Sequence, residues 1–184
     1  GAGLDFMVIG TGALADDEIR ARLVAAAERT GARLVLPAGA IAGIDGLSAL
    51  RLGGLDAVRY TATKPPYAWK DTPADDEFDL DAMTTATVIF EGPADLAARR
   101  YPKNANLAAT VALAGLGMER TEIRLVADPA IAPDNMGRIE ARGTLGTLDV
   151  QCRGRPAADN PKTSAVTAYS IVHRILNRGA AMVI

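Results

Sequence analysis

The first forty residues carry apolar runs in the order of a strand, a helix and a second strand. The run FMVI (residues 6–9) is bounded by glycines, which predicts a short buried parallel strand. A helix is expected from Asp16 to about Arg29, because apolar residues recur on one face and acidic residues at its start suit the helix dipole. A second apolar run, residues 33–36, follows Gly31. This spacing is typical of a strand–helix–strand unit with parallel strands.

Beyond residue 40 the pattern changes to strands that follow one another closely. The expected elements are a helix over 40–52, a strand over 58–63, an exposed loop over 67–82, a strand over 87–90, two helical parts within 93–115 (the second over 104–116), strands over 122–128, 138–142 and 145–153, and a last helix over 164–176 capped by residues 160–163. Strands without long crossovers predict a mixed or antiparallel sheet with helices on one face. The expected fold class is α/β: a cut-down nucleotide-binding half with a parallel sheet, followed by an α+β domain.

Composition narrows the class of partner. Of the 184 residues, 49% are hydrophobic and 23% charged, which allows one domain, or one domain plus part of another. Aromatic residues make up only 4%, so the core should consist of small and branched aliphatic side chains. The net charge of −2 is spread along the chain without a basic run, whereas phosphate backbones require clustered positive charge. A small-molecule partner is therefore favoured over a nucleic acid.

The sequence also bears on the compartment. Cys152 is the only cysteine, so no intrachain disulfide is possible and a cytoplasmic location is expected. No apolar run reaches about 18 residues, so no membrane partner is expected, and the start has no signal-peptide pattern. Because the chain begins at Gly1 and enters a strand almost at once, a fragment or a tag remnant is expected.

Two polar segments precede predicted helices and are candidate anion sites. They are YPKNAN (101–106) and NPKTS (160–164). Helix N-termini present unpaired N–H groups and positive potential, and each segment contains a lysine that strengthens the preference for a carboxylate. The alternative is that Asn104 and Asn160 are ordinary helix caps and turn residues.

Other reactive groups are sparse. The turn GTG (10–12) lacks the last glycine of a dinucleotide-binding motif and is interpreted as structural. His173 is the only histidine; no carboxylate four residues away could orient it, so a structural or surface role is favoured. Cys152 has no His or second Cys nearby and is interpreted as structural, and no zinc-type metal site is expected.

Three long stretches in register resemble the L-aspartate dehydrogenase family. They are LPAGAIAGIDGLSAL (36–50), YPKNANLAATVALAGLG (101–117) and NPKTSAVTAYSIVHRI (160–175), joined by VADPAIAPDN (126–135) and the turn TKPP (63–66). The resemblance runs in order from near residue 5 to the end of the chain.

This resemblance implies a two-domain enzyme. Residues 1–40 would be a remnant of a dinucleotide-binding Rossmann domain, and residues 41–184 an α+β catalytic and dimerisation domain. The family interconverts L-aspartate and iminosuccinate, or oxaloacetate plus ammonia, with NAD or NADP, and its product can feed NAD biosynthesis. A cytoplasmic homodimer acting on a dicarboxylic amino acid is therefore expected.

The resemblance also implies roles for particular residues. Ala40 and Asn106 match family positions that contact the cofactor. Lys162, Thr163 and Ser164 are candidates for binding the substrate carboxylates, because they carry donors next to a predicted helix start.

The sequence departs from the family in two places. The opening strand–helix unit with its glycine-rich phosphate turn is absent. The family's Asn-x-His reads Asn135-Met136-Gly137, so glycine stands where the proton-transfer histidine is expected. General acid–base help is worth about 10²–10⁴ in rate, and the catalytic group stays unassigned. Three interpretations are open: a dehydrogenase with another proton carrier, a divergent or non-catalytic ligand-binding and dimerisation module, and a fragment of a longer enzyme.

Overall fold

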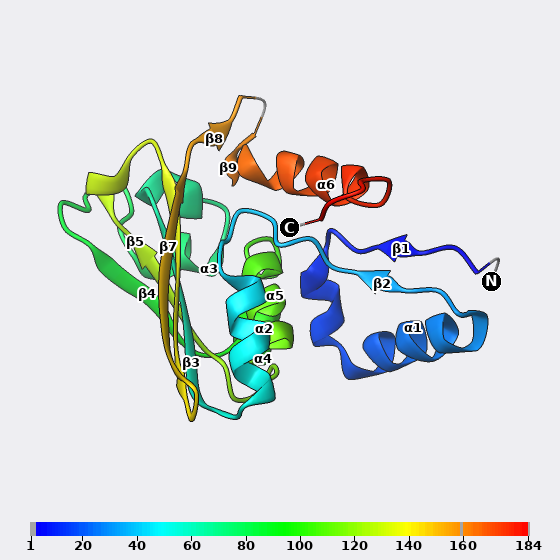
Figure 1. The fold of residues 1–184 in the computed structure, drawn as a ribbon. Coiled ribbons are helices and arrows are strands. Elements are labelled where there is room, and N and C mark those ends of the chain that lie inside the picture. Colours follow the sequence, from blue (N-terminus) through cyan, green and yellow to red (C-terminus); the bar gives the residue numbers. More distant parts are fainter. Residues whose placement is uncertain (1–2, 159, 184) are drawn as a thin grey trace.

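The chain folds into a small parallel pair of strands followed by a five-stranded mixed sheet, as a computed structural model shows (Figure 1). The structure describes residues 3–158 and 160–183, and for residues 160–162 the backbone alone. Its elements, in chain order, are β1 (Phe6–Met7), the 3₁₀ helix η1 (Thr11–Ala15), α1 (Asp17–Thr30), β2 (Leu34–Val35), α2 (Ile44–Leu52), β3 (Leu55–Lys64), the 3₁₀ helix η2 (Pro66–Trp69), α3 (Pro73–Glu77), β4 (Thr87–Pro93), α4 (Ala94–Arg100), α5 (Asn106–Ala114), β5 (Glu122–Ala127), the 3₁₀ helix η3 (Pro129–Ile131), β6 (Asn135–Gly143), β7 (Gly146–Gly154), β8 (Pro156–Ala157), β9 (Asn160–Ser164) and α6 (Val166–Leu176).

The predicted strand–helix–strand unit is confirmed. β1 and β2 pair in parallel, and α1 connects them. Helix α1 begins where the Asp16 carboxylate accepts a hydrogen bond from the Ile19 N–H at 3.0 Å, and it ends at Gly31, whose left-handed φ of 67° suits glycine. The prediction that the first strand is buried is wrong, because Phe6 and Ile9 are 55% and 52% exposed. These side chains are exposed because β1 is an edge strand of a two-stranded sheet, with β2 as its single neighbour.

The larger sheet has the strand order β4-β5-β3-β6-β7. Only β3 and β5 run parallel, and the other neighbours are antiparallel, which confirms the predicted mixed sheet. Helices α2, α4 and α5 lie on one face of it (Figure 1). The core is rich in small residues: five consecutive positions of α5, Ala108–Ala112, are buried. Small side chains let this helix approach the sheet closely, as the low aromatic content predicts.

The segment over 67–82 is not the exposed loop predicted from its lack of periodicity. It contains η2 and α3, and both Trp69 and Ala74 are fully buried. The Trp69 indole N–H donates a hydrogen bond to the Val126 carbonyl at 3.1 Å. The Thr72 hydroxyl accepts one from the Ala74 N–H at 3.3 Å and caps α3. A five-residue helix and one buried ring produce no repeating pattern of apolar residues, so this packing could not be predicted from the sequence.

The predicted cap of the last helix is also wrong. Residues 160–164 form strand β9, which pairs antiparallel with β8, and α6 begins only at Val166 after Ala165. The short strand β8 offers backbone hydrogen-bond partners that local sequence does not reveal. Within the described ranges no helix is long and apolar enough to cross a membrane.

Candidate functional site

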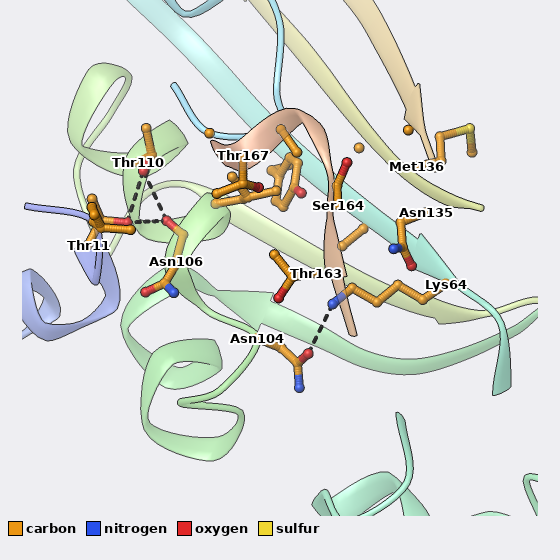
Figure 2. Close-up of a pocket in the computed structure, with 18 of the residues that line it drawn as sticks. Thr11, Lys64, Asn104, Asn106, Thr110, Asn135, Met136, Thr163, Ser164 and Thr167 are labelled. Atoms are coloured by element: carbon orange, nitrogen blue, oxygen red, sulfur yellow. Dashed lines mark hydrogen bonds between the residues drawn. The ribbon is translucent and has the colours of Figure 1, made fainter. Parts of the chain in front are cut away.

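A cavity of about 130 Å³ lies where the small parallel sheet, α5, the large sheet and the β9–α6 segment meet (Figure 2). Segments that lie far apart in the sequence therefore contribute to one site. Its lining residues are Ile9, Thr11, Pro37, Gly39, Ala40, Tyr60, Ala62, Lys64, Lys103, Asn104, Asn106, Leu107, Thr110, Asn135, Met136, Gly137, Gly154, Thr163, Ser164 and Thr167.

One wall of the cavity follows the carboxyl ends of the parallel strands β1 and β2. Ile9 comes after β1, and Pro37, Gly39 and Ala40 come after β2. Gly39 has a φ of 68°, and a Cβ there would lie 2.8 Å from the Leu107 Cδ2, so glycine suits this turn on two counts. Open parallel sheets bind dinucleotides outside the carboxyl ends of their strands. This wall has the position and the small residues that such a ligand requires.

Asn106 ties this wall to α5. Its Oδ1 accepts a hydrogen bond from the Gly12 N–H at 3.0 Å, and its backbone carbonyl accepts from the Thr11 hydroxyl at 2.5 Å and the Thr110 hydroxyl at 3.0 Å (Figure 2). The Thr11 hydroxyl and the Gly12 N–H of the GTG turn are thus hydrogen-bonded within the protein, in agreement with the structural interpretation of this turn. Asn106 Nδ2 donates to none of the described residues, which leaves it as a donor at the rim of the cavity.

Lysines supply positive charge at the opposite side. Lys64, the last residue of β3, donates a hydrogen bond from Nζ to Asn104 Oδ1 at 3.0 Å (Figure 2). Its Nζ also lies 5.3 Å from the centroid of the Trp69 ring, within the range of a cation–π contact. Lys103 is exposed at the rim. Asn104 does not cap α5, which starts at Asn106. It is a turn residue, as the alternative interpretation allowed, and its amide oxygen accepts the hydrogen bond from Lys64.

Two polar side chains of the cavity have no partner among the residues that the structure describes. The Oδ1 and Nδ2 of Asn135 and the Oγ of Ser164 are buried and make no hydrogen bond with them. A buried polar group without a hydrogen bond lowers the stability of a protein by about 1–3 kcal/mol, so such groups are rare in natural proteins. Gly154 makes room for Ser164, because a Cβ at residue 154 would clash with the Ser164 Oγ. A polar ligand in the cavity would satisfy these atoms.

Most of the residues singled out from the sequence meet here. Ala40, Asn106, Gly137, Thr163 and Ser164 all line the cavity. Lys162 lies in β9, but its side chain falls outside the part of the structure that is described.

The other residues weighed for reactivity lie elsewhere. His173 is exposed on α6 and does not line the cavity, and its ring nitrogen lies 3.3 Å from Asn177 Nδ2. Cys152, in β7, pairs across the ladder with Gly137. The described residues contain no group of three His, Cys, Asp or Glu side chains that could hold a metal ion.

Several lining residues, among them Tyr60, Lys64 and Asn135, were not predicted from the sequence to belong to the site. Tyr60, Ala62 and Lys64 occupy alternate positions of β3 and line the same cavity. The two-residue period of a strand places alternate side chains on one face. That period, read forward from Tyr60 to the TKPP turn, was the signal that could have found Lys64.

Comparison with known proteins gives one consistent family. The family model "Aspartate dehydrogenase, C-terminal" matches residues 45–178. L-aspartate dehydrogenase of Ralstonia pickettii is 53% identical over 180 residues, which cover 98% of this chain and 67% of that protein. L-aspartate dehydrogenase of Pseudomonas aeruginosa is 49% identical over 180 residues, with the same two coverages.

A solved structure agrees in fold. The crystal structure of aspartate dehydrogenase from Thermotoga maritima superposes with a TM-score of 0.79 at 27% identity, covering 99% of this chain and 68% of that one. The resemblance noted in the sequence is thereby confirmed over nearly the whole chain. The protein belongs to the L-aspartate dehydrogenase family.

Proposed function

We propose that the protein oxidises L-aspartate at its amino-bearing carbon, with NAD or NADP as the hydride acceptor. The observation that carries the proposal is the cavity itself. It joins the carboxyl ends of β1 and β2 to a wall with lysines and with the unpartnered polar atoms of Asn135 and Ser164. Relatives about 50% identical over 98% of this chain bear the name L-aspartate dehydrogenase.

The residues of the first wall fit a nicotinamide cofactor. The cofactor supplies a ring carbon that accepts the hydride. Ala40, 9% exposed after β2, would lie against it, and Asn106 would donate from Nδ2 at the rim. In this proposal residues 1–40, together with Asn106, form the cofactor side of the site, and the rest of residues 41–184 forms the substrate side and the dimerisation domain.

The other wall fits a small dicarboxylate. Lys64 and Lys103 would pair with the two carboxylates of aspartate, while Thr163, Ser164 and the Asn135 amide would donate hydrogen bonds to them. Lys162, adjacent in β9, is proposed as a third cation. Charge-assisted hydrogen bonds of this kind are the stronger ones, about 1.5–3 kcal/mol each.

A second candidate function follows from Gly137. Of the described residues that line the cavity, only Tyr60, Lys64 and Lys103 have side chains that titrate, and Gly137 offers no proton acceptor. A protein that binds the dicarboxylic amino acid without oxidising it, as a ligand-binding and dimerisation module, would have the same cavity.

Turnover separates the two functions. We would incubate the intact protein with NAD⁺ or NADP⁺ and follow formation of the reduced cofactor with L-aspartate, D-aspartate, L-glutamate and L-alanine. The proposed function predicts turnover with L-aspartate above the others. Binding of L-aspartate without turnover would favour the second candidate, and faster turnover of L-alanine would contradict the dicarboxylate site.

Lys64 provides a direct test of the substrate wall. The variant Lys64→Met keeps the length of the side chain and removes its charge, so the KM or Kd for L-aspartate should rise by about tenfold or more, the loss of one charge-assisted hydrogen bond. Lys70→Met is the matched control, because Lys70 forms an ion pair with Asp81 and does not line the cavity. Equal effects of the two variants would contradict the assignment.

A further inference from the structure

Position 137 is shaped around the absence of a side chain. Gly137 is buried in the middle of the large sheet, where it pairs with Ala62 of β3 and Cys152 of β7. A Cβ built there would lie 2.8 Å from the Ile41 Cδ1, 3.1 Å from the Tyr60 Oη and 3.2 Å from the Tyr60 Cε2. The space into which a residue at 137 would extend is already taken by Tyr60 and Ile41.

Tyr60 therefore brings a polar group to the part of the cavity beside Gly137. The residue is 2% exposed and lines the cavity from β3. Its hydroxyl makes no hydrogen bond with any residue that the structure describes, whereas the hydroxyl of Tyr101, the other large buried tyrosine, donates to the Ile89 carbonyl at 3.4 Å. A buried tyrosine hydroxyl usually has a partner.

The charge state of this hydroxyl limits what it can do. Burial raises the pKa of Tyr60, and the nearby Cys152 raises it further. At neutral pH the group is a neutral phenol, which can accept a hydrogen bond through its oxygen and donate one through its hydrogen. It will not act as a base.

We infer that the Tyr60 hydroxyl hydrogen-bonds the amino group of the bound substrate, and that Gly137 gives it the room to do so. The inference rests on the proposed function and deepens it. Lys64, Lys103 and Asn135 match the charged carboxylates. The neutral hydroxyl of Tyr60, which lies beside Gly137 without a partner among the described residues, suits the amine. Tyr60 orients the amino nitrogen without removing its proton, which passes to water.

The test compares Tyr60→Phe with Tyr101→Phe in the intact protein. Each variant removes one buried hydroxyl and keeps the ring, so a merely structural role would give similar losses of stability and no change in ligand affinity. The ligands are L-aspartate and succinate, which has both carboxylates and lacks the amine. Calorimetry should give a Kd for L-aspartate about tenfold higher in Tyr60→Phe, a succinate Kd that is unchanged, and no effect of Tyr101→Phe on either.

A second pair of variants checks the role of Gly137. Gly137→Ala should weaken L-aspartate binding by displacing the hydroxyl, and the same substitution in the Tyr60→Phe background should weaken it less. Residues that act through one contact show such non-additive effects. Equal effects in the two backgrounds would contradict the coupling.

The outcomes for the two proposals are distinct. If the wild-type protein oxidises or binds L-aspartate and Tyr60→Phe does so equally well, the Tyr60 inference is overturned and the proposed function stands. If the wild-type protein binds L-aspartate without oxidising it, the dehydrogenase function fails, and the Kd comparison still decides on Tyr60. If the wild-type protein binds neither ligand, both are overturned.

Discussion

At the scale of single residues, glycines decide how the site is shaped. Gly154 is the last residue of β7 and lies against the Ser164 side chain. Any other residue type would place a Cβ where the Ser164 hydroxyl lies. Ser164 is 8% exposed and its Oγ has no partner. The glycine therefore allows a buried hydroxyl to face the cavity. Leaving this hydroxyl without a partner lowers the stability of the protein, and a bound ligand would offset that loss.

Gly154→Ala tests this packing. The added methyl group should destabilise the protein by about 1–3 kcal/mol, as overpacking of a filled core does. In the Ser164→Ala background the same change should cost less, because the Ser164 Oγ with which the added methyl group clashes is gone. Denaturant unfolding of the four proteins measures the coupling, and additive losses would show that the two side chains do not meet.

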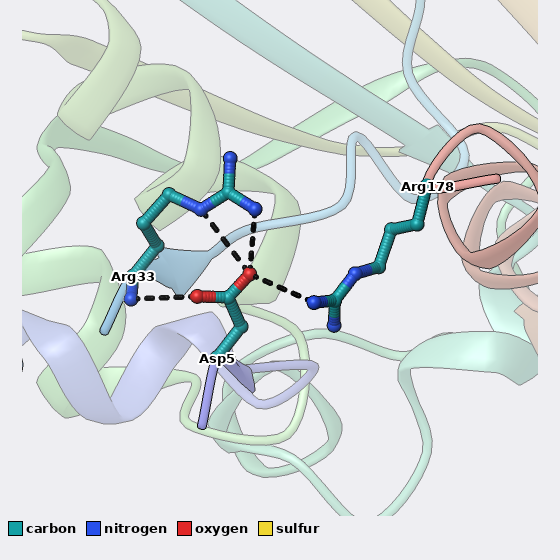
Figure 3. A network of polar contacts seen from close by, with 3 residues as sticks. All are labelled: Asp5, Arg33 and Arg178. Carbon is teal, nitrogen blue, oxygen red and sulfur yellow. Dashed lines mark hydrogen bonds and ion pairs between the residues drawn. The ribbon is translucent and has the colours of Figure 1, made fainter. Parts of the chain in front are cut away.

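At the scale of elements, one carboxylate joins three of them. Asp5, just before β1, accepts hydrogen bonds from the Arg33 backbone N–H at 2.9 Å and from its guanidinium at 2.7 and 3.1 Å (Figure 3). Arg178, just after α6, lies 3.3 Å from the same carboxylate. The start of β1, the start of β2 and the end of α6 are thus held at one point. These contacts, chiefly the hydrogen bond from Arg33, lower the pKa of Asp5.

This lowered pKa predicts how stability depends on pH. A carboxylate with a lowered folded-state pKa contributes stability above its unfolded pKa, about 3.9, and the contribution is lost as the pH falls through the folded value. Asp5→Asn should therefore be less stable than the wild type at neutral pH, and the difference should shrink in acid. Thermal unfolding between neutral pH and about pH 3 measures it. Asp56→Asn, an exposed carboxylate of β3, is the control for the loss of a charge.

Elements were predictable where the pattern is long and local. The βαβ unit, the strands of the large sheet and the two helical parts of 93–115 follow from repeating apolar positions and from turn residues. β9 and the buried Trp69 were missed for a different reason. Strand β9 depends on pairing with β8 across a turn, and Trp69 depends on the Val126 carbonyl, which is distant in sequence. Neither contact produces a periodic pattern of apolar residues.

The candidate site divides in the same way. Ala40 and Asn106 were found through family motifs, and Thr163 and Ser164 through their donors next to a predicted helix start. The structure brings all four to one cavity. Asn135 was named only as the first residue of the family's Asn-x-His motif, and nothing in the sequence marked it as a ligand-binding residue. Only the burial of its amide without a partner makes it notable.

At the scale of the whole molecule, the core is unevenly distributed. Its central cluster is drawn from residues 41–141, and the central strands β3, β5 and β6 each contribute residues that are at most 2% exposed. The small sheet contributes strands of two residues each, and α1 contains no buried residue. Resistance to local opening follows the number of buried apolar contacts.

Hydrogen exchange should reflect this distribution. Backbone amides of β3, β5 and β6 should exchange slowest, and those of β1, β2 and α1 much faster. Mass spectrometry of peptides after timed exchange provides the measurement. A bound nicotinamide cofactor should slow exchange in the segments 9–12 and 37–40 most strongly, because they form its side of the cavity. Uniform protection across the chain would contradict this account.

The position of Lys64 over the Trp69 ring has an optical consequence. Trp69 is the only tryptophan of the chain, its indole is fully buried, and the cation 5.3 Å from its centroid lines the cavity. The emission energy of an indole depends on the electric field of nearby charges. A dicarboxylate that pairs with Lys64 reduces that field, so the intrinsic fluorescence of the protein should shift as the site fills and stay constant in Lys64→Met. The fluorescence of Trp69 should therefore report whether the cavity is occupied.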